Sequence, residues 1–174
     1  ESLTAAEVYV RYCTSETEKA ALLFTYLAER FPYQQGDSRT PVYSALCQGV
    51  ANSKSMAQSW QLLCDEAGLS CRTVSGLRGG EAYWWNIVTL DGVSCHVDVL
   101  RDLLDGSTLR LRYDEDMAGG YYWDAEDVPA CPAPVPEEEE PEAPAPTEDQ
   151  PASEDPAEDP AETPEAQPTE PETP

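Results

Sequence analysis

Hydrophobic residues in the first third of the chain recur at helical spacing. Over 4–13 their positions predict a short first helix. A second helix is expected after Ser15 or Thr17, since either hydroxyl can cap it, and Pro32 ends it because proline cannot continue a helix. Its apolar face consists of Ala20, Leu23, Phe24, Leu27 and Phe31.

The pattern changes from helix to strand in the middle of the chain. After a polar loop at 34–41, a third helix is expected from about 53 to 67, ended by Gly68. Asp91-Gly92 is a strong hairpin signal. The alternating runs predict three strands, at 71–75, 83–90 and 94–99. These elements indicate an α+β domain in which helices pack on an antiparallel sheet.

A second region begins at residue 132. Residues 132–174 contain no aromatic, cysteine, lysine or arginine, and they carry 15 of the 34 acidic residues among repeated prolines and alanines. Such a segment cannot bury enough apolar surface to offset the entropy of ordering. We therefore expect a folded domain at 1–131 and a disordered, acidic, Pro-rich tail or linker at 132–174.

Net charge narrows the choice of partners. The formal charge is -24, of which the tail carries 15 negative charges and residues 1–131 the remaining 9. Both regions should repel phosphate backbones, which argues against a nucleic-acid partner. No run approaches the roughly 18 apolar residues of a membrane-spanning helix, and no charged leader precedes an apolar run.

Six cysteines allow fifteen complete disulfide pairings. Two alternatives remain: the cysteines form at least one disulfide, or several of them are free thiols that pack as small buried hydrophobic side chains. The sequence has no Cys-x-x-Cys motif and a single histidine, so no metal or other cofactor is expected. A long acidic Pro-rich tail is typical of a cell-surface spacer, which favours an extracellular or cell-surface location.

Several blocks resemble a known family. The run 44–56 leads into a helix ending Leu62-Leu63-Cys64 and a strand ending Ser75-Gly76. This order is similar to bacterial transglutaminase-like domains, where a Gly-x-Ala-x-Cys-Gln-Gly-Tyr run opens a helix ending Leu-Leu-Cys-x-x-x-Gly-Ile and a strand ends in Ser-Gly. The resemblance covers about residues 14–132 and implies a papain-like fold, with the loop at 34–41 as one wall of the cleft.

The resemblance also implies a reactive triad of cysteine, histidine and aspartate, in which a thiolate attacks an amide carbonyl. Matched without gaps from the helix end, the nucleophile position is Ser53. Tyr83 takes the place of the histidine, and Asp98 keeps the third position. We expect Ser53 to cap its helix and Tyr83 to donate a hydrogen bond to Asp98, because a phenol is too weakly basic to replace an imidazole.

Two other residues are alternatives for the nucleophile and the base. Cys47, in Cys47-Gln48-Gly49-Val50-Ala51, resembles the family's nucleophile run locally. His96 lies two residues before Asp98, on the same strand face, and is a possible displaced base. An active amidohydrolase, peptidase or acyltransferase would use Cys47 or Ser53 as its nucleophile.

Aromatic side chains gather around the expected cleft, and those considered for ligand binding are Trp60, Trp84 and Trp85. Alternation sends Trp84 and Trp85 to opposite faces of the sheet, so one is expected in the core and one in a groove. The resulting hypothesis is a catalytically inactive, monomeric domain of a secreted or surface bacterial protein. It would act as a binding or structural module for a peptide, a protein or a cell-wall glycan.

Overall fold

The computed structural model describes residues 2–134. Its helices are α1 (Ser2–Val10), α2 (Glu16–Arg30), α3 (Val42–Cys47), α4 (Ser53–Glu66), α5 (Val99–Leu104) and α6 (Asp114–Met117). Its strands are β1 (Gln34–Gln35), β2 (Val50–Ala51), β3 (Ser70–Arg78), β4 (Glu81–Leu90), β5 (Val93–Val97) and β6 (Tyr121–Tyr122). The expected tail lies, from residue 135 on, outside the described residues. Within the described part, no helix has both the length and the apolar character needed to span a membrane.

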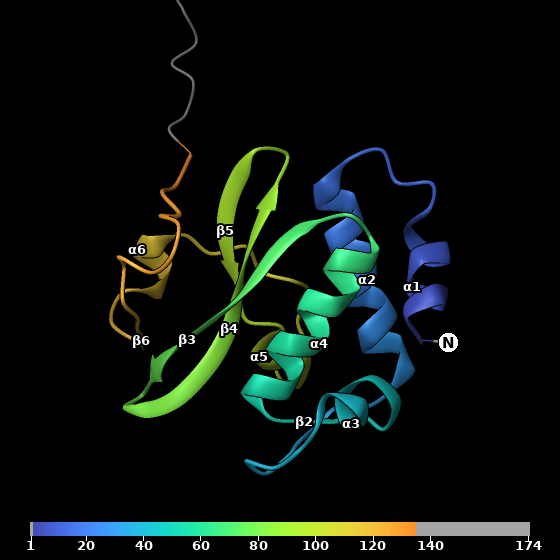
Figure 1. The fold of residues 1–174 in the computed structure, drawn as a ribbon, viewed down its shortest axis with the longest axis horizontal. Coiled ribbons are helices and arrows are strands. Elements are labelled where there is room, and N and C mark those ends of the chain that lie inside the picture. The colour runs from blue at the N-terminus through green and yellow to red at the C-terminus, as the bar shows by residue number, and fades with distance from the viewer. Residues whose placement is uncertain (1, 135–174) are drawn as a thin grey trace, which may run out of the picture. The chain divides into compact units, whose positions relative to one another are not determined.

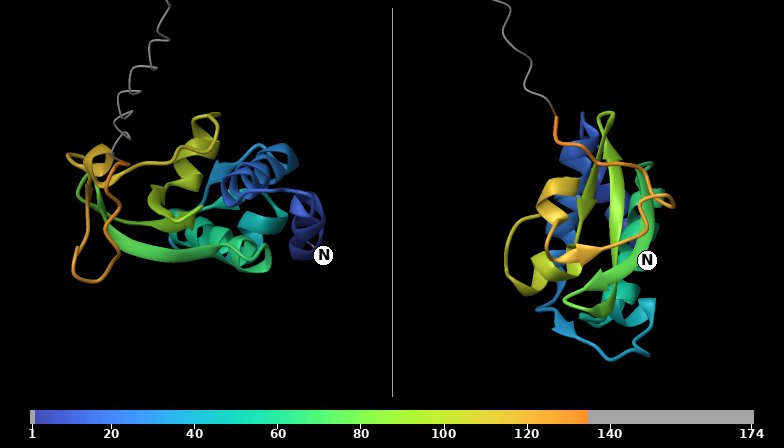
Figure 2. Two further views of the ribbon diagram at one scale, coloured as in Figure 1. Left: turned by 90° about the horizontal axis from the view of Figure 1, so that it is seen from above. Right: turned by 90° about the vertical axis from the view of Figure 1, so that its left-hand side faces the viewer.

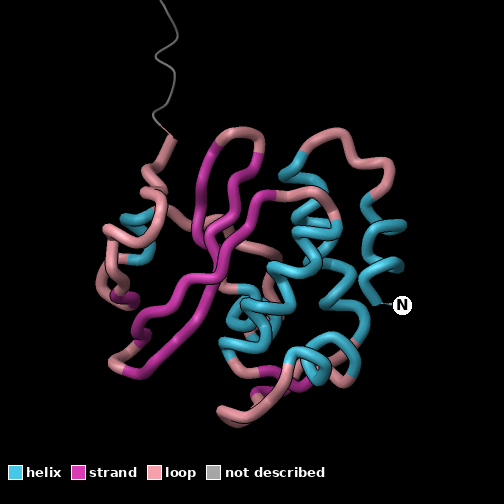
Figure 3. Tube along the Cα trace, viewed as in Figure 1, coloured by secondary structure: helices cyan, strands magenta, loops and turns pink. Residues whose placement is uncertain are grey.

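Four strands form an antiparallel sheet in the order β5-β4-β3-β6 (Figures 1 and 3). The predicted hairpin between β4 and β5 is confirmed, since Asp91 and Gly92 both have positive φ, 51° and 85°. The Asp91 carboxylate also accepts hydrogen bonds from the backbone N–H groups of Glu16 and Thr17, 3.0 and 3.1 Å away. The hairpin is thereby tied to the start of α2.

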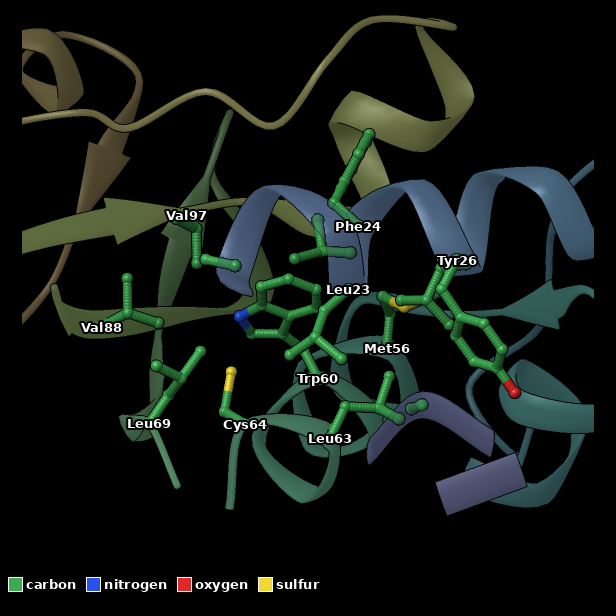
Figure 4. Packing of buried hydrophobic residues seen from close by; sticks show 14 of the residues in the cluster. Leu23, Phe24, Tyr26, Met56, Trp60, Leu63, Cys64, Leu69, Val88 and Val97 are labelled. Carbon is green, nitrogen blue, oxygen red and sulfur yellow. The ribbon is translucent and has the colours of Figure 1, made fainter. Parts of the chain in front are cut away.

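One face of the sheet packs against α4, which in turn packs against α1 and α2 (Figure 1). The core on this side is centred on the fully buried ring of Trp60. Figure 4 shows that ring among side chains from α2, α4 and the sheet, including Leu23, Met56 and Val97. The predicted α+β arrangement of helices on an antiparallel sheet is confirmed.

The other face of the sheet carries a smaller core. Here the sheet contributes Val74, Trp85 and Ile87, and the segment after α5 contributes Met117, Tyr121 and Cys131. Figure 2 shows this segment, drawn in orange, lying against the sheet. With both faces covered, residues 85–88 in the middle of β4 are all buried.

Helix α4 begins and ends with defined caps. Asn52 is the N-cap, because its side chain accepts a hydrogen bond from the Ser55 N–H at 2.7 Å while the Ser55 hydroxyl accepts one from the Asn52 N–H at 3.0 Å. The expectation that Ser53 caps this helix is therefore wrong, since Ser53 is the first helical residue. At the other end Gly68 has a φ of 74°, and the N–H of Leu69 bonds the carbonyl of Cys64, which closes a Schellman motif.

The strand predicted at 94–99 is shorter than expected. It ends at Val97, because Asp98 caps α5 by accepting a hydrogen bond from the N–H of Arg101 at 3.1 Å. By contrast, β3 runs past its predicted end at 75 to Arg78 and turns through Gly79 and Gly80, whose φ values are 59° and 87°. The second hairpin lengthens the sheet beside the start of α4.

Candidate functional site

A pocket of about 420 Å³ lies at the N-terminal end of α4. Three segments line it: the loop after β1, the first turn of α4 and the start of β4. The lining includes Asp37, Ser53, Lys54, Glu81, Tyr83 and Trp84. The polar loop predicted at 34–41 thus forms one wall, and the positions matched to a nucleophile and a base lie at the same pocket.

Ser53 is half-buried at the first position of α4, where the helix dipole favours negative charge. Asn52 has taken over the capping role, so the Ser53 hydroxyl is not needed to start the helix. Among the described residues its oxygen has no hydrogen-bond partner. A hydroxyl with no neighbouring base stays protonated and is a poor nucleophile.

Tyr83 faces Asp98, and its hydroxyl donates a hydrogen bond to Asp98 Oδ1 at 3.0 Å. The hydrogen bond expected from the sequence is present. Burial, followed by the charge of Asp98, raises the pKa of Tyr83 well above its ordinary value near 10. The phenol is therefore a hydrogen-bond donor at neutral pH and does not accept a proton from a nucleophile.

The Asp98 carboxylate is 2% exposed and fully engaged. The hydroxyl of Tyr121 donates to Oδ2 at 2.6 Å, while Oδ1 accepts from Tyr83 and from the Arg101 N–H. Arg78 lies 4.0 Å from Oδ2 and compensates its charge. These partners explain how a charged group is accommodated in the interior.

Two arginines complete this cluster. Arg78 donates to the Tyr83 hydroxyl at 3.2 Å and covers the rings of both Tyr83 and Tyr121. Arg101 donates to the Tyr121 hydroxyl at 3.3 Å. Neither arginine was predicted as a site residue, because each reaches the site only through the register of the β3–β4 hairpin or the start of α5.

His96 lies elsewhere, on the second core, and is fully buried. Its Nδ1 accepts a hydrogen bond from Trp85 Nε1 at 3.0 Å, and its Nε2 lies 2.9 Å from Asp114 Oδ1. Because the indole can only donate, Nδ1 must be the acceptor and Nε2 must carry the proton. Both ring nitrogens are thus hydrogen-bonded away from the pocket, so the structure does not place His96 where the alternative of a displaced base requires it.

His96, Asp114 and Cys131 place potential ligand atoms within 4.8 Å of one another. A histidine that binds a metal through Nε2 usually donates its Nδ1 proton to an acceptor, whereas here Nδ1 receives the Trp85 N–H. Burial and the charge of Asp114 also raise the pKa of Cys131 to about 12, which keeps it a thiol. The arrangement fits a hydrogen-bonded anchor better than a metal centre.

Cys47 is the last residue of α3 and is half-buried. A helix C-terminus carries partial negative charge and disfavours a thiolate, which is the opposite of the environment that the resemblance requires. The structure does not bring His96 to it, because both His96 ring nitrogens are bonded to Trp85 and Asp114.

The three tryptophans considered for binding have different environments. Trp60 and Trp85 are 0% and 1% exposed in the two cores, so neither is accessible to a ligand and both are corrected as candidate binding residues. Trp84 is half-buried and lines the pocket, with Lys54 Nζ 5.6 Å from its ring centre. The predicted split of Trp84 and Trp85 between groove and core is what the structure shows.

Among solved structures, two examples show partial similarity to this chain. One is described as a "putative protease" from Parabacteroides distasonis, with 15% identity, a TM-score of 0.44 and coverage of 55% of this chain and 22% of that one. The other, a "putative cysteine protease" from Cytophaga hutchinsonii, has 10% identity, a TM-score of 0.48 and coverage of 70% and 46%. The chain thus spans less than half the length of each. No curated protein matches it.

A family match covers the site itself. Residues 4–99, more than half of the chain, match the core domain of the transglutaminase-like superfamily. This range includes the helix that starts at Ser53, the strand that carries Tyr83 and the end of the strand before Asp98. The mixed architecture of helices on an antiparallel sheet agrees with the papain-like fold of that family. The chain therefore belongs to the transglutaminase-like superfamily.

Proposed function

We propose that this domain is a catalytically inactive member of its family that binds an extended peptide in the pocket at the start of α4. The observation that carries the proposal is the hydrogen bond from Tyr83 to Asp98. In the family's chemistry an imidazole would occupy that position and take the proton of the nucleophile. Here a phenol occupies it, and Ser53 stands where a thiol is expected.

The loss of either reactive group is severe. In the serine protease subtilisin, removal of the nucleophile or the base alone lowers turnover by about a million-fold. The only histidine of the chain is bonded to Trp85 and Asp114 in the second core. Support for an inactive domain therefore comes from what surrounds Ser53 as well as from its identity.

The shape of the sheet favours a peptide. Strand β4 pairs with β5 only from Asn86 onward. Within the described residues, the stretch from Glu81 to Trp85 therefore pairs with β3 on one side and with no strand on the other. Every second residue of a strand directs its backbone N–H and C=O to the same side. Asn86 directs these groups toward β5, so Ala82 and Trp84 direct theirs to the unpaired edge on that side. An extended peptide can add to such an edge.

Side chains at the pocket complement a bound peptide. Trp84 offers an aromatic face for an apolar side chain, and Asp37 and Glu81 offer carboxylates to a basic one. The charge of -24 on the whole chain adds a long-range preference for cationic segments. We therefore propose basic, extended peptides as ligands, ahead of cell-wall glycans, which would use Trp84 but not the strand edge.

A binding titration tests the proposal. Full-length protein is titrated with a library of extended Lys- and Arg-containing peptides and, separately, with soluble cell-wall fragments, while tryptophan fluorescence and heat are recorded. Trp84→Ala should weaken peptide binding by at least about tenfold. Tyr12→Ala, a matched control at an 85% exposed ring on the loop after α1, should leave it unchanged.

Each outcome of this titration supports or contradicts one part of the proposed function. Binding of glycans but not peptides would replace the proposed ligand class. No binding of either would favour a structural role. Hydrolysis of a peptide together with fluorophosphonate labelling of Ser53 would overturn the inactive assignment.

We also propose a secreted or cell-surface protein, on the basis of the acidic Pro-rich composition of residues 132–174. Protease treatment of intact cells of the source organism tests this, since a surface protein is cleaved and a protein inside the cell is protected.

A further inference from the structure

Three of the six cysteines meet on the face of the sheet that packs against α4. In the strand register Cys71 of β3 and Cys95 of β5 both pair with Val88, one on each side. Cys64, near the end of α4, packs in the same core. Figure 4 shows its sulfur between Leu69 and Trp60, directed toward the sheet.

Strand spacing decides which of these thiols can pair. Cys71 and Cys95 are separated by two strand intervals, about 9.5 Å, whereas bridged cysteines need Cα atoms within about 7 Å. Cys64 and Cys71 are neighbours, because both pack in the core that contains Val88, the strand partner of Cys71, and Cys71 is the largest cause of the raised pKa of Cys64. The chain between them folds back through the Schellman turn at Gly68, which brings the end of the helix to the start of the strand.

We infer that Cys64 and Cys71 form a thiol pair that closes to a disulfide when the protein meets a small-molecule disulfide oxidant. Cys71 is half-buried and provides the entry point, while Cys64 is fully buried and acts as the resolving thiol. This pairing is one of the many that the cysteine count leaves open, and it does not depend on the proposed peptide binding.

The exchange is balanced in two steps. Cys71 loses its proton to solvent, and its thiolate attacks one sulfur of oxidised glutathione, which breaks that S–S bond and releases one glutathione thiolate. Cys64 then loses its proton and attacks the Cys71 sulfur, which forms the Cys64–Cys71 bond and expels the second glutathione thiolate. Two protein thiols are oxidised and one glutathione disulfide is reduced to two thiols.

The second step should be the slower one. Once Cys71 is part of the mixed disulfide it bears no thiol, and burial is the remaining cause that raises the pKa of Cys64, so its thiolate is scarce at neutral pH. Mildly alkaline conditions should therefore accelerate closure. The bond would join α4 to β3 across their connecting turn, which fixes the helix that presents Ser53 to the pocket.

Mass spectrometry of the full chain tests the inference. After incubation with oxidised glutathione and then alkylation without reduction, the protein should have lost two hydrogen atoms and retained four alkylatable thiols. A glutamate-specific protease that cuts after Glu66 separates the two cysteines, and the resulting peptides should remain joined until reduced. Thermal unfolding of the oxidised protein should shift upward by several degrees.

Variants provide the matched comparison. Cys64→Ala and Cys71→Ser should each abolish the two-hydrogen loss, whereas Cys47→Ser, at a half-buried cysteine of α3, should retain it. Six alkylated thiols, a stable glutathione adduct on Cys71, or a bridge to any other cysteine in the wild-type protein would overturn the inference. Because peptide mapping of the wild type decides this alone, poor folding of a variant does not affect the result.

Discussion

At the residue scale, one hydrogen bond explains most of the chemistry of this pocket. The Tyr83 phenol fills the position from which an imidazole would serve a nucleophile, and Asp98, which would orient that imidazole, is bonded instead to two phenols and a backbone N–H. The carboxylate keeps a structural role as the cap of α5. Its retention in the sequence is therefore explained without catalysis.

Replacing the two altered side chains tests this interpretation. In the double variant Ser53→Cys, Tyr83→His, the thiol lies at a helix N-terminus beside an imidazole, both of which lower a cysteine pKa. Its alkylation by iodoacetamide at neutral pH should be about tenfold faster or more than that of Ser53→Cys alone. Equal rates in the two variants would show that the side chains at positions 53 and 83 are too far apart to interact across the pocket.

Alkaline pH should destabilise the protein through its buried phenols and thiols. Burial raises the pKa of Tyr33 to about 12, of Cys95 to about 11 and of Tyr83 higher still. A folded-state pKa above the unfolded value contributes stability that is present below the unfolded pKa and is lost as pH rises through the folded one. The free energy of unfolding should fall above about pH 8.5 as unfolded thiols ionise, and more steeply above about pH 10.

Urea unfolding at a series of pH values measures this dependence. Tyr83→Phe should reduce the slope above pH 10 by up to about 1.4 kcal/mol per pH unit, which is the contribution of one proton. Tyr122→Phe, at a ring that is 61% exposed, is the control and should keep the wild-type slope. A Tyr83→Phe slope equal to that of the wild type would contradict the environment described for this phenol.

At the element scale, α4 is the part of the fold that positions the pocket. Its start is fixed by the reciprocal bonds of Asn52 and Ser55, and Asn52 Nδ2 also donates to the carbonyl of Asp37 at 2.6 Å. That last bond holds the loop after β1 against the helix. One asparagine thus defines both the first turn and the opposite wall.

The cap can be separated from its neighbour by mutation. Asn52→Ala should lower the free energy of unfolding by about 0.5–2 kcal/mol, the usual cost of losing an N-cap. Ser53→Ala should change it by less than about 0.5 kcal/mol, since this hydroxyl has no partner among the described residues. Chemical denaturation of both variants measures the difference, and the reverse order would restore Ser53 as the cap.

At the scale of the whole molecule, the segment after α5 closes the second face of the sheet. Asp114 holds it there, because Oδ1 meets His96 Nε2 and Oδ2 accepts the Cys131 N–H at 2.9 Å. The buried carboxylate of Asp102, in α5, pairs with Arg112, which lies in the same segment just before α6. The pocket needs this closure, since Tyr121 belongs to the same segment and bonds Asp98.

Removal of the Asp114 carboxylate should therefore affect residues that do not contact it. Asp114→Ala should cost about 1–3 kcal/mol, because His96 and the Cys131 N–H lose their partner. Hydrogen exchange should show faster exchange across residues 113–131 and, through Tyr121, at the start of α5. Glu115→Ala, at an exposed neighbouring residue, is the control. Protection of 113–131 that matches the wild type in Asp114→Ala would show that the apolar core alone holds the segment.

Much of the local structure followed from the sequence, because it depends on near neighbours. The helices, the turn at Asp91-Gly92 and the alternation of Trp84 and Trp85 are set by residues a few positions apart. The bond between Tyr83 and Asp98 was also predicted, since the family resemblance assigns the two residues to one triad. Local features of this kind depend little on the rest of the fold.

Only the tertiary structure decided the rest. Whether Asn52 or Ser53 caps α4 depends on which of the two takes the extended N-cap conformation, and both residue types suit the role. That Trp60 is buried while Trp84 is accessible, and that His96 turns to Trp85 and Asp114, depends on segments more than ten residues away. Composition and periodicity specify which side chains seek burial or a polar partner, but long-range packing selects the partner, because many pairings satisfy the same pattern.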